Sequence, residues 1–374
     1  MSTIRSLHLH AGMLLLASSL AACSSSDSTD PGGAAGSAGS STDAAAPETG
    51  ASCTETGPLD LGGTWVARLD LELDLSSQAG GAATLCPDQQ TGRASMIVIF
   101  SNSHPAGSTA IDSVQPVVCS LELPELTGMV GECDPSAPQL MSINLIASPA
   151  LQKTLHAVPV APVKASLAST DPGAAITIDR FVLTGGTRKT TDPLPAWDAT
   201  LPGCGPSDAN IGRSPTCEQS CVDDCGALVD DDADGWAATT FHICGYTSDD
   251  KTSGVQCRAE SPSEAGVVVQ GKLMMAFLVD PLLQGKALSS CEVRGGADAR
   301  VLYHVLGGDI YLANSALSVV SSFKSLPLFD VDPKTSVFRM LRVDGKHGSQ
   351  DWGLGGVDPE AACAMALQHV NELL

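Results

Sequence analysis

The sequence has few aromatic residues and few cations. Its 374 residues include four Trp, three Tyr and seven Phe, so exposed rings for stacking on carbohydrate are scarce. Lys and Arg together number 20 against 42 Asp and Glu, and the formal net charge is −22 at pH 7. A chain this acidic repels a phosphate backbone, and this excludes nucleic acid as an expected partner.

Recognisable catalytic motifs are also missing from the sequence. It contains no H-E-x-x-H pair, no G-x-S-x-G elbow and no phosphate-binding loop. Six histidines follow residue 22, and none of them pairs with another at helical spacing. The sequence therefore predicts no catalytic residue. An exported hydrolase whose site is assembled from distant residues is the enzymatic alternative.

The apolar run at residues 11–22 is too short to cross a hydrocarbon core, which takes about 20 residues. With one preceding cation, Arg5, and small residues at its end, it is typical of a secretory signal peptide over residues 1–22. The stretch Leu20-Ala21-Ala22-Cys23 resembles the lipobox of bacterial lipoproteins. The resemblance implies cleavage before Cys23, diacylglycerol on its thiol and usually acylation of the new amine. The alternative is an ordinary signal peptide with a cysteine at its boundary by chance.

Residues 24–52, which follow the lipobox cysteine, contain no aromatic residue, no Leu, Ile or Val, and no cation. Such a segment cannot bury enough apolar surface to offset its ordering entropy. We expect residues 23–52 to form a lipidated cysteine and a disordered tether with a reach of roughly 30 Å. The expected partner is a membrane, bound through the lipid. Ser24 favours the outer membrane, on its periplasmic side or at the cell surface.

The chain contains 13 cysteines, of which twelve remain if Cys23 carries lipid. An even count in an exported chain favours disulfides, although the spacing does not reveal their connectivity. The alternative is a thiolate metal site at Cys217, Cys221 and Cys225, but this spacing lacks the short C-x2-C pairs of a zinc site. The twelve disulfide candidates are Cys53, Cys86, Cys119, Cys133, Cys204, Cys217, Cys221, Cys225, Cys244, Cys257, Cys291 and Cys363.

Alternating apolar and polar residues predict β-strands along most of the chain. The clearest strand is 63–75, where every second residue from Trp65 to Leu75 is apolar, as expected for one buried and one wet face. Glycine-rich turns such as 293–297 and 306–309 are expected to separate neighbouring strands. The other predicted strands are 94–100, 116–123, 140–147, 175–184, 265–279, 299–306, 309–317 and 336–344.

These elements predict a mainly β fold, an antiparallel sandwich or barrel-like pair of β halves. The halves cover 53–200 and 261–374, and a cysteine-rich acidic loop region, 201–260, lies between them. The second half is expected to end in a helix over 358–374. Asp358 can cap this helix, Pro359 fits its first turn, and a disulfide from Cys363 would attach it to the sheet.

One acidic loop has the spacing of a calcium site. Asp230, Asp232 and Asp234 stand at alternate positions, Gly235 follows, and Trp236 can offer a backbone carbonyl. These residues resemble the first half of an EF-hand-type loop, or the short calcium loops of thrombospondin type 3 repeats. The resemblance implies a calcium ion as cofactor.

The acid that closes an EF-hand loop is missing here, because position twelve is Phe241. We expect weak affinity, on the order of 10⁻⁴–10⁻³ M, as in extracellular modules. The alternative interpretation is a solvated acidic turn without an ion. Candidates for the missing ligand are the nearby acids Asp223, Asp224, Asp249 and Asp250.

A second short resemblance lies at Gly62-Gly63-Thr64-Trp65, which is similar to the G-x-W opening of lipocalins. It implies a carrier of a hydrophobic small molecule, with the tryptophan closing one end of a barrel. The alternative is a core tryptophan that begins an ordinary strand. The hypothesis that unites most features is a non-enzymatic binding or structural module, anchored by lipid and stabilised by disulfides and calcium.

Overall fold

The computed structural model describes residues 53, 57–76, 91–105, 107–129, 140–204, 216, 221–247, 269–312, 315–317 and 328–374. The signal peptide, Cys23 and the tether lie outside the described residues. Four disulfide candidates and two candidate calcium ligands also lie outside them: Cys86, Cys133, Cys217, Cys257, Asp249 and Asp250.

The described fold is mainly β and antiparallel, as the sequence predicted, and its fourteen described strands belong to one sheet. The first eight are β1 (Gly63–Ser76), β2 (Thr91–Ser103), β3 (Ala110–Glu122), β4 (Glu125–Met129), β5 (Leu140–Ala147), β6 (Val163–Leu167), β7 (Ala174–Ile178) and β8 (Leu183–Gly185). The others are β9 (Thr239–Thr247), β10 (Val269–Ser289), β11 (Glu292–Leu312), β12 (Ser315–Leu317), β13 (Leu328–Val331) and β14 (Val337–Arg342).

Eight of these strands form a closed ring. Neighbouring strands pair in the order β1, β2, β3, β6, β7, β10, β11 and β14, and β14 returns to pair with β1. Trp65 at the start of β1 is the register partner of Arg342 at the end of β14. The ring therefore joins strands from both of the segments that the sequence suggested as separate halves.

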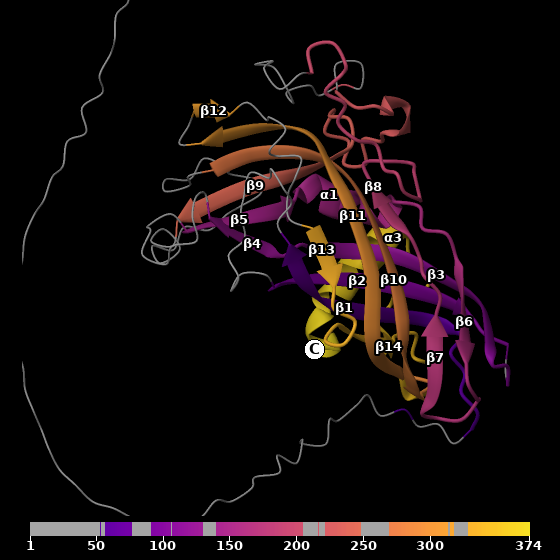
Figure 1. Cartoon of the computed structure of the whole chain (residues 1–374). Helices are drawn as coiled ribbons and strands as arrows, with labels where there is room; N and C mark the ends of the chain where they lie inside the picture. Colours follow the sequence, from indigo (N-terminus) through magenta and orange to yellow (C-terminus); the bar gives the residue numbers. More distant parts are fainter. Residues whose placement is uncertain are drawn as a thin grey trace, which may run out of the picture. The chain divides into compact units, whose positions relative to one another are not determined.

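Strands β10 and β11 form an unusually long hairpin of 21 residues per strand. Near its turn the hairpin completes the ring, through β7 on one side and β14 on the other. Beyond the ring, β10 pairs with β9, β9 pairs with β5, and β5 pairs with β4. On the other side of the hairpin, β11 pairs with β12. Figure 1 shows the two strands as one long curved pair that links these regions. Strand β9 lies inside the segment that we expected to be loop.

The main core lies on the inner face of the sheet. The apolar alternation of β1 has the predicted effect, because its odd-numbered residues from Trp65 to Leu75 all belong to this core. Phe100 packs edge-on against Phe181 with ring centres 5.6 Å apart, and Phe241 packs similarly against Phe277 at 5.9 Å. Fully burying one such side chain contributes about 1.5–3 kcal/mol, so the core is the main source of stability.

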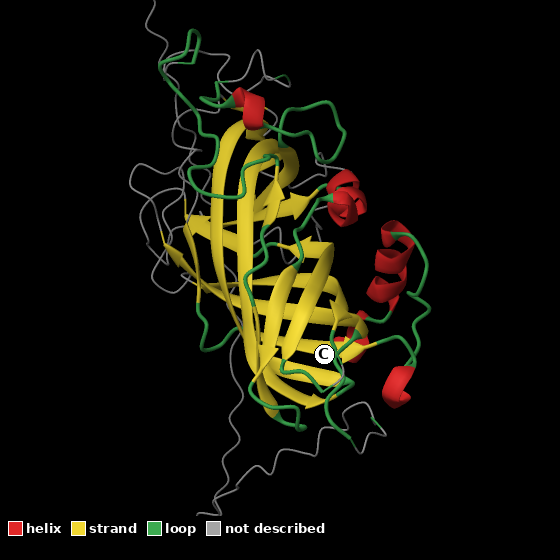
Figure 2. Cartoon of the chain, turned by 90° about the vertical axis from the view of Figure 1, so that its right-hand side faces the viewer, coloured by secondary structure: helices red, strands yellow, loops and turns green. Residues whose placement is uncertain are grey.

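The outer face of β1 and β2 is covered by the C-terminal segment. Helix α3 (Pro359–Gln368) packs with Val66, Ile97 and Ile99 in a second apolar cluster, and a 3-10 turn at Val370–Leu373 follows it. The Asp358 carboxylate accepts a hydrogen bond from the Ala361 amide at 3.0 Å, which confirms the predicted cap. Figure 2 shows the helices beside the strands rather than between them.

A third, smaller cluster lies where the acidic loop region covers β10 and β11. Val222 and Ala238 from the loop pack with Met274 and Ala276 of β10 and Leu306 of β11. A short helix, α1 (Pro149–Thr154), and a 3-10 turn (Leu155–Ala157) follow β5 nearby in sequence. Further 3-10 turns lie at Cys225–Ala227 and Lys346–Gly348.

The described residues contain disulfides, as the cysteine count predicted, and two of these bonds join residues far apart in the sequence. Cys119 of β3 is bonded to Cys363 of α3, which confirms the predicted attachment of the C-terminal helix. The other described pairs are Cys53–Cys291 and Cys204–Cys221, and both Cys225 and Cys244 are also disulfide-bonded.

Two expected turns were wrong. The glycine-containing stretches at 293–297 and 306–309 lie inside the continuous strand β11. In the first of them, Gly295 stands opposite Gly285 of β10. A Cβ atom at Gly285 would overlap the Arg294 carbonyl oxygen, so glycine here permits close approach of two strands rather than a turn.

Candidate metal centre

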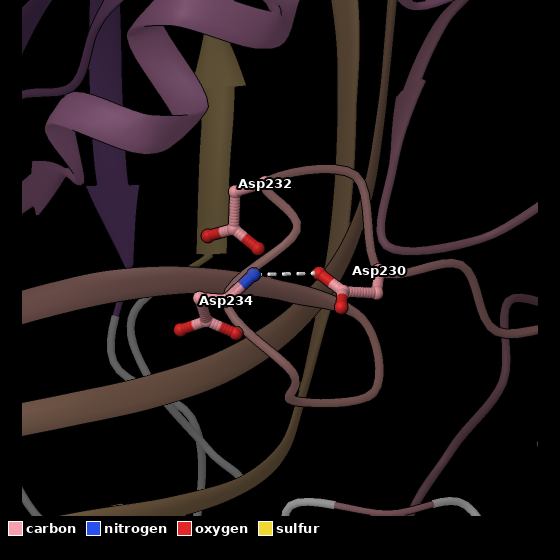
Figure 3. A group of neighbouring side chains, drawn as sticks. All are labelled: Asp230, Asp232 and Asp234. Atoms are coloured by element: carbon pink, nitrogen blue, oxygen red, sulfur yellow. Dashed lines mark hydrogen bonds between the residues drawn. The ribbon is translucent and has the colours of Figure 1, made fainter.

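Three carboxylates converge in the loop before β9. Asp230, Asp232 and Asp234 each offer one oxygen, and these oxygens lie within 4.8 Å of one another. Figure 3 shows the three side chains gathered inside one turn of the chain. Among the described residues, no other group of three or more acidic, His or Cys side chains is close enough to share a metal ion.

The loop is shaped by its own aspartates. Asp230 accepts hydrogen bonds from the amides of Asp234 and Gly235 at 3.2 and 3.0 Å, and Asp234 accepts one from the Trp236 amide at 2.8 Å. Such side-chain-to-backbone bonds stabilise tight turns. The turn places Ala233 and Gly235 at positive φ, 52° and 87°. The three alternate carboxylates therefore lie close together in this turn.

Asp232 is the buried member of the group, with 3% of its surface exposed. Its Oδ2 atom accepts hydrogen bonds from the Thr240 amide at 3.1 Å and the Ser148 hydroxyl at 3.3 Å. Its Oδ1 atom and the Thr240 hydroxyl are also buried, and neither has a hydrogen-bond partner among the described residues. A buried acceptor without a partner costs about 1–3 kcal/mol, more for a charged group, and a bound cation would remove that cost.

The electrostatics of the group follow from this burial. Desolvation first, and then the negative charge of Asp234, raise the pKa of Asp232 to about 7. Burial also raises the pKa of the neighbouring Asp231, against hydrogen bonds from the Gly186 amide and the Thr239 hydroxyl. Asp231 therefore faces away from the group and attaches the loop to the residue after β8.

One cation of the protein stands at the edge of the group. The Lys272 ammonium of β10 lies 3.8 Å from Asp234 Oδ2 and 5.8 Å from the centre of the Trp236 ring. The register partner of Lys272 on β9 is His242. Burial, followed by the charge of Lys272, lowers the pKa of His242, and the nearby charge of Asp234 opposes this shift.

The structure brings together Asp230, Asp232 and Asp234. Of the acids suggested for the closing position, the two that are described, Asp223 and Asp224, make contacts elsewhere. Asp223 accepts a hydrogen bond from the Ala196 amide at 2.8 Å, and Asp224 pairs with Lys189 at 2.7 Å. Sequence reasoning missed Ser148, Thr240 and Lys272. Hydroxyl and ammonium groups carry no spacing signal, and two of these residues come from other parts of the chain.

The predicted G-x-W tryptophan lies in the core where β1 begins. Trp65 is fully buried, and its indole N–H donates to the Leu61 carbonyl at 3.0 Å. The guanidinium of Arg342 lies 5.9 Å from the ring centre. Arg342 donates to the carbonyls of Asp60 and Gly62 and to the Asp344 carboxylate. This arrangement fastens the start of β1 to the end of β14.

Four of the described histidines make structural contacts. His347 bonds to the Asp60 carboxylate at 2.9 Å, and His104 contacts the Leu61 amide at 2.9 Å. His304 contacts the Pro195 carbonyl at 3.0 Å, and the His369 ring stacks on Trp352.

A hollow of about 880 Å³ lies outside the ring, between α1 and α3. Its floor includes Cys119, Cys363 and Ala147, and its polar residues are Gln152, Lys153, His156 and Glu360.

The comparisons with known proteins give no family for this chain. No known family model matches the sequence, and no curated protein is similar to it. Within the described residues, none of the helices combines the length and the apolar character that crossing a membrane requires.

Proposed function

We propose that this protein is a non-enzymatic binding or structural module whose acidic loop is fixed by a calcium ion. The supporting observation is the convergence of three aspartates around Asp232, whose Oδ1 atom is buried and has no hydrogen-bond partner among the described residues. Hard divalent cations prefer carboxylate and carbonyl oxygens, which are the atoms that this loop offers. Asp230, Asp232 and Asp234 would hold the ion, with the Trp236 carbonyl as a further ligand.

The position of the loop indicates what the ion would do. Asp232 contacts Thr240 at the start of β9 and Ser148, whose hydroxyl also caps α1 through the Leu151 amide at 3.0 Å. An ion at Asp232 would therefore fasten the loop to β9 and to the first turn of α1. We assign it a structural role, because these contacts join three separate elements of the chain, the acidic loop, β9 and α1.

Thermal unfolding tests this role. With 5 mM calcium and a dissociation constant near 10⁻⁴–10⁻³ M, binding to the folded state contributes about 1–2 kcal/mol. For a domain of this size the melting temperature should rise by about 2–4 °C relative to chelator. Asp232→Asn should abolish the rise, whereas Asp112→Asn, an exposed acid on β3, should preserve it. A native protein that melts at the same temperature in calcium and in chelator contradicts the proposal.

The proposed location is the outer membrane, on its periplasmic side or at the cell surface, through lipid on Cys23. Support comes from the lipobox-like residues 20–23 and the tether composition. Several acyl chains anchor a protein durably, at about 0.8 kcal/mol for each buried CH₂. Fractionation of cells should find the native chain with membranes and the Cys23→Ala chain in the soluble fraction. Membrane retention of the variant contradicts lipid anchoring.

A second candidate function is transport of a hydrophobic small molecule. The observation that favours it is the closed ring of eight antiparallel strands that begins at Trp65. Rings of eight strands either fill their interior with side chains or hold one small ligand. Titration with an apolar dye whose emission rises in an apolar site would distinguish these cases. A saturable rise at one dye per chain supports a carrier, and no rise favours the structural module.

A further inference from the structure

Lys272 is an internal counter-ion of the aspartate group. Its ammonium lies 3.8 Å from Asp234 Oδ2 and 5.8 Å from the centre of the Trp236 ring. Its side chain is 41% exposed, so the ammonium can move into solvent without disturbing the core. The position of the backbone is fixed, because Lys272 pairs with His242 of β9 and Asp309 of β11 in the middle of the sheet.

The charges around the loop explain why a lysine here matters. Three carboxylates lie within one turn, and an ammonium at Asp234 offsets part of their mutual repulsion. A divalent cation would supply the same compensation more strongly, but it would repel the ammonium. The two cations therefore compete for Asp234. Trp236 adds a second attraction, because its ring face favours the ammonium when calcium is absent.

We infer that Lys272 is a built-in competitor that weakens divalent-cation binding at the Asp230–Asp232–Asp234 loop and moves away from Asp234 when the ion enters. This inference rests on the proposed calcium site and adds the residue that sets its affinity. It predicts a loop that is occupied at extracellular calcium concentrations and empties when calcium falls. Without the lysine, the same three carboxylates would bind more tightly.

Calorimetric titration of the full chain with calcium chloride tests the inference. Lys272→Met removes the charge and keeps the length of the side chain, and it should tighten binding about 10-fold, because a unit charge within a few ångströms changes ion affinity by this order. Lys272→Gln should act in the same direction if the methionine variant folds poorly. Lys272→Arg keeps the charge and should bind like the native chain. Lys286→Met, an exposed lysine on the same strand, is the matched control.

Tryptophan emission gives an independent readout. Departure of the ammonium from the Trp236 ring should change the emission of the native chain as calcium is added. The change should disappear in Trp236→Phe and in Lys272→Met, although calcium still binds to both.

The outcomes separate the two proposals. Calcium binding with unchanged affinity in Lys272→Met and Lys272→Gln overturns the competitor role and leaves the site in place. Absence of heat in the native chain and in both neutral variants overturns the calcium site itself.

Discussion

At the scale of single residues, the protein buries charged side chains whose hydrogen-bonding groups are satisfied to different degrees. Arg342 has a fully buried side chain, and its hydrogen bonds go to Asp344 and to backbone carbonyls. Asp232 is nearly as buried, but one of its oxygens has no partner among the described residues. The first arrangement is complete and structural. The second is the kind of deficit that a ligand can satisfy, and this difference identifies the acidic loop as the candidate site.

The carboxylates beside Arg342 make stability depend on acid. Burial alone would raise the pKa of Asp60, but the Gly62 amide, His347 and Arg342 together hold it below the ordinary 3.8. The pKa of Asp344 is also lowered. Burial would raise it, but the hydrogen bonds from Arg342 and from the Lys346 amide outweigh this effect. Groups with lowered folded-state pKa values stabilise the fold above their unfolded pKa and lose this contribution as pH falls through the folded value.

We therefore expect the urea midpoint to fall between pH 6 and pH 3, and to fall less in a variant with Asp60→Asn and Asp344→Asn. The double variant should already be less stable at pH 6, where the native carboxylates are ionised and paired. Urea unfolding at the two pH values measures both effects. Asp112→Asn, which removes an exposed carboxylate, is the control. An equal acid sensitivity of the double variant and this control would contradict the assignment.

At the scale of elements, the long β10–β11 hairpin is the part of the fold that sequence reasoning handled least well. The sequence pattern predicted a strand at 265–279 and separate strands at 299–306 and 309–317. It also predicted turns at the glycine-containing stretches 293–297 and 306–309. In the structure Gly295 instead permits close approach of the two strands. A local pattern cannot distinguish these roles, because the partner strand that requires a small residue lies elsewhere in the sequence.

Gly285→Ala tests the close approach directly. The added Cβ would overlap the Arg294 carbonyl oxygen and the Gly295 Cα atom across the hairpin, so the strands must separate where they complete the ring. We expect a loss of about 1–3 kcal/mol, typical of overpacking. Gly226→Ala is the matched control, since nothing lies within 4 Å of its added Cβ. Chemical unfolding of both variants provides the measurement, and equal stability of the two would refute a steric role for Gly285.

At the scale of the whole molecule, the sequence predicted the fold class and much of its local structure. Strand β1, the capped C-terminal helix and the disulfide from Cys363 were predicted because each has a signal in the sequence: alternation, a cap, and a cysteine in a chain that we expect to be exported. Closure of the ring was not predicted, since pairing of β1 with β14 depends on contacts across the chain. The same limit applies to the site, where the aspartates were predicted and Ser148 and Lys272 were not.

The Cys119–Cys363 disulfide fastens the last helix, α3, over the outer face of β1 and β2. Replacing both cysteines with serine should destabilise the chain by about 2–4 kcal/mol and release α3 at lower denaturant concentration than the ring. Release would expose Val66, Ile97 and Ile99, so an apolar dye should bind before global unfolding. The paired control replaces Cys204 and Cys221 with serine. The disulfide between these two residues closes a loop of only 17 residues in a different region of the chain. Because a shorter loop restricts the unfolded chain less, the control should lose less stability and show no early dye binding. If the two double variants unfold alike, the helix is held by packing alone and the disulfide is not what closes this face.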